Sequence, residues 1–100
     1  MKPVLVECRD LFFRGKIQEI IRRAGAEPVR GENEPYQLAV VELGKPGVEQ
    51  RISELIRRGV TVLAFGSHVD AAALRAARDL GARAVPNSQL ESELGALLAT

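Results

Sequence analysis

The chain has 100 residues, of which 46% are hydrophobic and 27% are charged, with 14 Lys and Arg against 13 Asp and Glu. Such a composition is typical of one folded domain and excludes a disordered tail, a fibre and a membrane protein. The net charge of +1 argues against nucleic-acid binding. The single cysteine, Cys8, excludes an intrachain disulfide, and without a signal peptide it favours a reducing cytoplasm. We therefore expect one cytoplasmic domain over residues 1–100.

The first third of the chain predicts a strand, a helix and a weaker strand. Residues 4–6 are apolar and run into polar residues, as in a buried strand. Asp10 is a suitable N-cap residue for the following helix, and Gly25 occupies the usual stop position. The apolar side chains of that helix recur at helical spacing: Phe13, Ile17, Ile20, Ile21 and Ala24. Residues 26–30 predict the weaker strand, and residues 31–35 form a turn cluster.

The remaining two thirds predict three strands, each followed by a helix. The strands are residues 38–41, 60–65 and 82–85, of which residues 60–65 are the most strand-like because of their β-branched and aromatic side chains. The last helix begins with the capping-box sequence Ser-Gln-Leu-Glu at residues 88–91. The apolar faces of the three helices are, in chain order: Val48, Ile52, Leu55 and Ile56; Val69, Ala73, Ala76, Ala77 and Leu80; Leu90, Leu94, Leu97 and Leu98.

This alternation predicts a three-layer α/β fold with a five-stranded, mostly parallel sheet and about four helices. One connection is unusual, because only about seven or eight residues separate the second strand from the third, whereas a parallel crossover with a helix needs a dozen or more. Either the second strand is not parallel, or its crossover helix has shrunk to a loop.

Two segments carry a family resemblance that extends over nearly the whole chain. Residues 42–47, Glu-Leu-Gly-Lys-Pro-Gly, resemble the Asp-x-x-x-Pro-x turn in the receiver domain of bacterial two-component response regulators. Residues 67–82 are similar to the stretch from the fourth strand to the Gly-Ala before the fifth strand in that family. The resemblance implies a flavodoxin-like sheet of order 2-1-3-4-5, here without the helix between strands 2 and 3. It also implies a role in signal transduction through a phosphorelay.

The residues that match the family's phosphorylation site differ in type from those the family uses. Receivers accept a phosphoryl group on an Asp after strand 3, with Mg²⁺ on an acidic pair after strand 1, a Ser or Thr after strand 4 and a Lys after strand 5. The matching positions here are, in chain order, Cys8 and Arg9, Glu42, Gly66 or Ser67, and Asn87. The resemblance therefore implies a degenerate pseudo-receiver without metal, cofactor or enzymatic activity. We expect the Arg9 cation to pair with Glu42, which is either a built-in mimic of a charged acceptor or a remnant.

Two surfaces are candidates for protein contacts. In receivers, partners dock on a surface formed by the fourth helix, the fifth strand and the fifth helix. The residues that match it are Leu74, Arg75, Arg78 and Arg83, with a solvated helix face as the competing interpretation. The missing helix would also leave apolar sheet surface uncovered near Val29, and we expect a second subunit to cover it in a homodimer.

Other interpretations remain open. Cys8 and Arg14 satisfy C-x5-R after the first strand, the layout of small cysteine-dependent phosphatases, although the intervening residues are bulky and lack Gly. Ligand sensing in the cleft at the carboxyl ends of the strands is a third interpretation. A metal site of Cys8, Glu42 and His68 is conceivable at the same edge, against a solvent-facing His68. The basic pairs at residues 22–23 and 57–58 lie near predicted helix ends, where the helix dipole favours positive charge. They therefore need no nucleic-acid partner to explain them.

Overall fold

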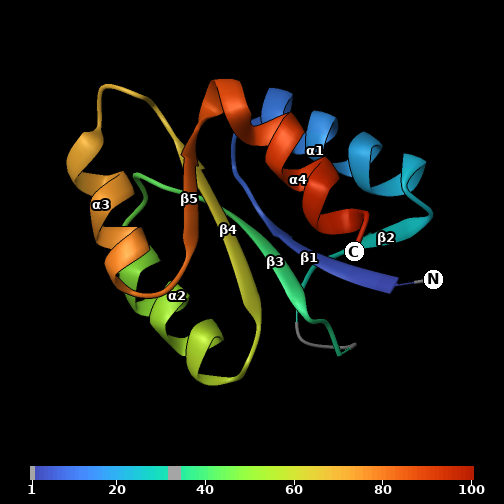
Figure 1. Cartoon of the computed structure of the whole chain (residues 1–100), viewed down its shortest axis with the longest axis horizontal. Helices are drawn as coiled ribbons and strands as arrows, with labels where there is room; N and C mark the ends of the chain where they lie inside the picture. Colours follow the sequence, from blue (N-terminus) through green and yellow to red (C-terminus); the bar gives the residue numbers. More distant parts are fainter. Residues whose placement is uncertain (1, 32–34) are drawn as a thin grey trace.

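Five parallel strands form the middle layer of the structure (Figure 1). The computed structural model describes residues 2–31 and 35–100. The strand order is β2-β1-β3-β4-β5, which confirms the sequence-based expectation. The strands are β1 (Lys2–Glu7), β2 (Ala26–Val29), β3 (Leu38–Glu42), β4 (Thr61–Gly66) and β5 (Arg83–Pro86). Every strand therefore ends at the same edge of the sheet, and side chains that follow the strands can meet there.

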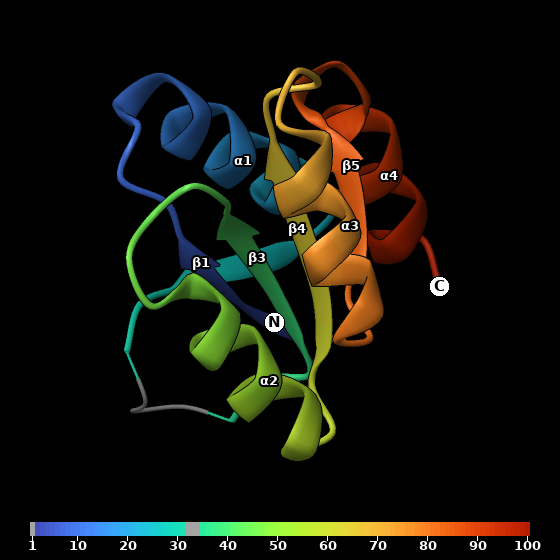
Figure 2. The same cartoon turned by 90° about the vertical axis from the view of Figure 1, so that its left-hand side faces the viewer.

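Helices cover both faces of this sheet. They are α1 (Leu11–Arg23), α2 (Val48–Arg57), α3 (Ala71–Asp79) and α4 (Leu90–Leu98). Figure 2 shows α2 and α3 in front of the sheet, with α1 and α4 on the opposite face. Among residues 2–31 and 35–100, no helix is long and apolar enough to cross a membrane.

The core consists of two apolar clusters, one on each face of the sheet. Successive side chains of a strand point to opposite faces, so β3 contributes Val41 to one cluster and Val40 to the other. The cluster under α2 and α3 contains Leu5, and the cluster under α1 and α4 contains Phe65. Because both strand faces are buried, the central strands have continuous apolar sequences rather than alternating ones.

The helix ends follow the sequence signals in part. The Asp10 carboxylate accepts a hydrogen bond from the Phe13 N–H at 3.1 Å, so α1 begins where the N-cap predicted. The predicted capping box at residues 88–91 does not form. A short 3-10 turn, η1 (Asn87–Gln89), leads into α4 instead, and the N-cap side chain of Gln89 makes no capping bond.

The short connection between β2 and β3 joins two parallel strands, so β2 is not reversed. β2 pairs in parallel with β1, with Pro28 opposite Val4. No described residue between Val29 and Leu38 is helical, and residues 32–34 of the predicted turn cluster lie outside the described residues. A parallel crossover is thus made without a helix in the part of the chain that the structure describes.

The sheet face beside this loop is better covered than the sequence suggested. Leu5 of β1 is 0% exposed and belongs to the same apolar cluster as Tyr36, which lies between β2 and β3. Val29 is half-buried. The apolar surface expected to bind a second subunit is therefore small, and the homodimer stays a prediction.

The buried face of α3 contains Ala73, Ala77 and Leu80 as predicted, but it differs at two other residues. Leu74, expected to lie off the core face and to contact a partner, is only 6% exposed and packs in the core, whereas Val69 is 78% exposed. The reason is that α3 begins at Ala71, after the Asp70 N-cap, so Val69 precedes the helix and does not share its periodicity. The interpretation of Leu74 as a surface residue is therefore wrong.

Both edge strands of the sheet are short and contain a proline. β2 has the sequence Ala-Glu-Pro-Val, and β5 has the sequence Arg-Ala-Val-Pro. Proline has no backbone N–H to donate and is tolerated in edge strands for that reason.

Candidate functional site

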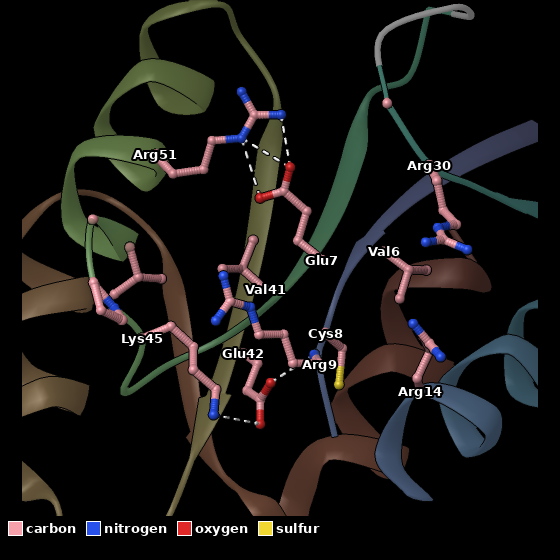
Figure 3. Close-up of a pocket in the computed structure, with 14 residues that line it drawn as sticks. Val6, Glu7, Cys8, Arg9, Arg14, Arg30, Val41, Glu42, Lys45 and Arg51 are labelled. Carbon is pink, nitrogen blue, oxygen red and sulfur yellow. Dashed lines mark hydrogen bonds and ion pairs between the residues drawn. The ribbon is translucent and has the colours of Figure 1, made fainter. Parts of the chain in front are cut away.

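A pocket of about 570 Å³ opens at the carboxyl ends of β1 and β3 (Figure 3). Its walls come from the β1–α1 loop, the β3–α2 turn, the start of α2 and the residues that follow β2. Three of the predicted site residues line it: Cys8, Arg9 and Glu42. The fold thus brings together residues that are more than 30 positions apart in the sequence.

The Glu42 carboxylate joins β3 to the start of α1. Its Oε1 accepts a hydrogen bond from the Arg9 N–H at 2.8 Å and a longer one from the Asp10 N–H at 3.4 Å. Its Oε2 lies 4.0 Å from Lys45 Nζ. N–H groups just before a helix have no partner within the helix and carry partial positive charge, so a carboxylate is stabilised there.

The expected ion pair between the Arg9 guanidinium and Glu42 is not formed. Arg9 contacts Glu42 through its backbone N–H, and Figure 3 shows its side chain leading away from the carboxylate. The Arg9 side chain is exposed, and the cation nearest the Glu42 carboxylate is Lys45. The expectation that the Arg9 cation pairs with Glu42 was therefore wrong, because Arg9 reaches the carboxylate only through its backbone N–H.

Cys8 is buried beside this carboxylate. Its Sγ lies 3.4 Å from the Asp10 carbonyl oxygen, to which the thiol donates. Burial, and to a smaller extent the negative charge of Glu42, raise the pKa of the Cys8 thiol to about 11. The thiol is therefore protonated at neutral pH, whereas a cysteine nucleophile needs a depressed pKa. Although Cys8 and Arg14 both line the pocket, this environment opposes phosphatase chemistry.

Substituting Glu42 by Gln should lower the pKa of the Cys8 thiol below its value of about 11, because the substitution removes a neighbouring negative charge. The amide oxygen can still accept the Arg9 N–H, so the loop is retained. The rate of Cys8 alkylation by iodoacetamide, followed by intact mass across pH, measures the shift. Glu54→Gln, which removes a carboxylate of α2 that does not act on Cys8, is the control. An unchanged alkylation profile in the Glu42 variant would contradict the assignment.

Cys8 and Arg9, which follow β1, do not fit Mg²⁺. This ion prefers carboxylate and water oxygens, whereas Cys8 offers a protonated thiol and Arg9 a cation. The nearby carboxylates have other contacts, since Asp10 caps α1 and Glu7 pairs with Arg51. Within the described ranges, no three His, Cys, Asp or Glu side chains are grouped to hold a metal, and His68 is exposed.

The other three predicted site positions do not line the pocket. A Cβ atom at Gly66 would lie 3.2 Å from Leu43 Cβ, which leaves little room for a Ser or Thr side chain. Ser67 is exposed, and its Oγ accepts a hydrogen bond from the Val69 N–H at 3.3 Å. Asn87 lies in η1, beyond the end of β5.

An ion pair that the sequence did not indicate forms one wall of the pocket. Arg51 of α2 contacts the Glu7 carboxylate at the end of β1, with Nη2 to Oε2 at 2.8 Å and Nε to Oε1 at 3.1 Å. Arg51 also pairs with Glu54 at 2.8 Å. Glu7 lies two residues after Leu5 and thus on the α2 face of β1. This alternation is the only feature of the sequence that indicated a contact between Glu7 and α2. Choosing Arg51 as its partner required the placement of α2.

Most of the predicted partner surface has structural contacts of its own. Arg78 donates from Nε and Nη2 to the Ala84 carbonyl oxygen, at 3.0 and 2.8 Å, and so joins α3 to β5. Arg83 pairs with Glu93 of α4 at 3.0 Å. Arg75 is exposed and makes no ion pair with the described residues.

The architecture is similar to that of solved receiver domains. No protein-family model and no curated protein sequence matches the chain. A CheY-like protein, TadZ, from Pseudomonas aeruginosa is 19% identical with a TM-score of 0.76, covering 99% of this chain and 98% of the other. The BeF3-activated DrrB receiver domain is 14% identical with a TM-score of 0.81, covering 99% and 95%. The chain has the receiver-domain fold.

A response regulator from Thermotoga maritima extends the comparison. It is 11% identical with a TM-score of 0.79, and the alignment covers 100% of this chain and 99% of the other. At these sequence identities the similarity shows the fold alone. The chemistry of the site therefore depends on its own residues, Glu42, Cys8 and Arg9. The comparison confirms the sequence-based resemblance in sheet order and in helix arrangement.

Proposed function

We propose that this receiver-like domain is non-catalytic, is not phosphorylated in the usual way, and acts by protein contact in a signalling or regulatory assembly. The observation that carries the proposal is the Glu42 carboxylate, which already accepts the Arg9 N–H at 2.8 Å. A charged group held at this point is what a phosphorylated acceptor would otherwise supply. The domain would thus stay in one state or respond to a signal other than phosphate.

Phosphoryl transfer depends on positioning and charge neutralisation, mainly by a metal ion. A thiol with a raised pKa and a guanidinium stand where the acidic pair would be, and Glu7 is paired with Arg51. These groups would repel or fail to coordinate Mg²⁺, which supports the absence of acceptor activity at Glu42.

Incubation with acetyl phosphate and Mg²⁺ tests this proposal. We expect the intact mass of the protein to remain unchanged, because Glu42 lacks the metal that would neutralise the developing charge. An active receiver domain with an Asp acceptor, labelled in the same mixture, shows that the reagent works. A stoichiometric gain of one phosphoryl group would overturn the proposal.

Exposed apolar side chains at the start of α1 support a protein contact near Glu42. Leu11 is 72% exposed and Phe12 is 71% exposed, directly after the loop that Glu42 holds. On the predicted α3–β5 surface, Arg75 remains available for a partner, whereas Arg78 and Arg83 are engaged within the domain. We infer that a partner contacts the start of α1, where it can sense the loop between β1 and α1.

A second candidate function is ligand sensing, with the pocket between β1 and β3 as its supporting observation. Its volume of about 570 Å³ lies within the range of small-molecule sites. Ligand binding there would act on the same loop that Glu42 holds.

A further inference from the structure

Three of the arginines that line the pocket form no ion pair with any residue that the structure describes. Among the residues that the structure describes, the ion pairs of the pocket join Arg51 to Glu7 and Lys45 to Glu42. Arg9, Arg14 and Arg30 also line the pocket, and none of them forms an ion pair with a described residue. The pocket therefore carries an excess of positive charge, although the whole chain has a net charge of only +1.

Two of these arginines come from separate elements and lie on the same side of β1. Figure 3 shows the guanidinium groups of Arg14, on α1, and Arg30, just after β2, on either side of Val6. Like charges held near one another repel, and a bound anion would relieve that repulsion. The Cys8 thiol on this wall is protonated at neutral pH because of its raised pKa, so it supplies no compensating charge.

The topology of the sheet also favours a ligand at this place. The chain order reverses between β1 and β3, since β2 lies on one side of β1 while β3, β4 and β5 follow on the other. In open parallel sheets, ligands bind outside the carboxyl ends of the strands at such a switch point. The pocket lies at that point.

We propose that this pocket binds, without covalent chemistry, a small phosphorylated molecule with at least two negative charges. Its phosphate would lie between Arg14 and Arg30, with Arg9 at the rim. The guanidinium fork matches phosphate oxygens in bidentate geometry. A pocket of about 570 Å³ is larger than one inorganic anion requires, so the ligand has an organic part. The proposal rests on the ligand-sensing function and is independent of whether Glu42 can be phosphorylated.

Titration calorimetry on the full chain, with pyrophosphate, ADP and citrate as separate probes, tests this inference. We expect pyrophosphate and ADP to bind, with affinity that falls as salt is added. Arg14→Gln and Arg30→Gln should each weaken binding roughly tenfold, because each removes a charged hydrogen-bond donor. Arg75→Gln removes the same charge from α3, outside the pocket, and should change the affinity less than about twofold.

The outcomes separate the ligand class from the sensing function. Binding of citrate without pyrophosphate or ADP would overturn the phosphate class and leave ligand sensing intact. Binding by none of the three probes would overturn the proposal that this pocket binds an anion. Equal losses in the Arg75 variant and the pocket variants would show attraction to overall charge and would also overturn the proposed site. Circular dichroism checks that the variants fold, which is expected because neither pocket arginine forms an ion pair in the described part of the chain.

Discussion

Replacing Phe65 by alanine is expected to lower the free energy of unfolding by about 3–5 kcal/mol. Phe65 lies near the carboxyl end of β4, is 1% exposed, and packs against Phe13 of α1 with ring centroids 5.6 Å apart. The substitution would leave a cavity between the sheet and α1, which the flanking strands prevent from collapsing. Since a domain of this size is stable by about 5–15 kcal/mol, the loss is a large part of the total.

Urea unfolding followed by circular dichroism measures this effect. Phe12→Ala is a matched control, because it deletes the same atoms from a side chain that is 71% exposed. We expect the control to lower the free energy of unfolding by less than about 1.5 kcal/mol, because the Phe12 ring contacts only the Phe13 ring, at 5.3 Å between centroids, among the described aromatic residues. Equal losses in the two variants would contradict the assignment of the buried face of α1.

Replacing Leu74 by alanine is expected to lower the free energy of unfolding by about 2–5 kcal/mol, because the side chain belongs to the core cluster beneath α2 and α3. A leucine on a docking surface would instead affect partner binding and leave the isolated domain as stable as before. The experiment therefore separates the two interpretations of this residue directly.

Thermal unfolding of the Leu74 variant beside Arg75→Ala gives the comparison. Arg75 is the next residue on the same helix, is exposed, and should be close to neutral when truncated. If the Leu74 variant unfolded at the same temperature as the wild type, the assignment of Leu74 to the core face of α3 would be wrong.

The order of strands and helices followed from the sequence because each element has a clear period and clear stop signals. Val4 to Val6 and Leu38 to Val41 are continuous apolar runs, as buried parallel strands require. The sheet order came from the resemblance to receivers. Parallel pairing of β2 was left open by the short connection, and only the register of Pro28 with Val4 decided it.

Two errors had local causes. Val69 fits the apolar spacing of α3, but Asp70 caps the helix after it, so spacing alone wrongly included Val69 in the buried face. Ala73, Ala77 and Leu80 do pack in the core as predicted. The capping box at residues 88–91 was lost because a 3-10 turn shifts the start of α4 to Leu90. In both helices the apolar period was right, and the error lay in the residues just before the first turn.

The candidate site was predictable in its location and only partly in its contacts. Cys8, Arg9 and Glu42 meet because carboxyl ends of parallel strands share one edge. Which group of Arg9 reaches Glu42 depends on the geometry of the β1–α1 loop, which residue types do not determine. The approach of Arg14 and Arg30 needs the packing of α1 beside β2, so sequence spacing carried no signal for it.

The prolines in the two edge strands limit how copies of this domain can associate. An open sheet edge is a template for another strand, and growth from edge to edge leads to open-ended fibres. Pro28 in β2 and Pro86 in β5 interrupt that template at both ends of the sheet. Addition of a further strand along these edges is therefore disfavoured, and we expect contacts of this domain with itself or with a partner to form through helices and loops.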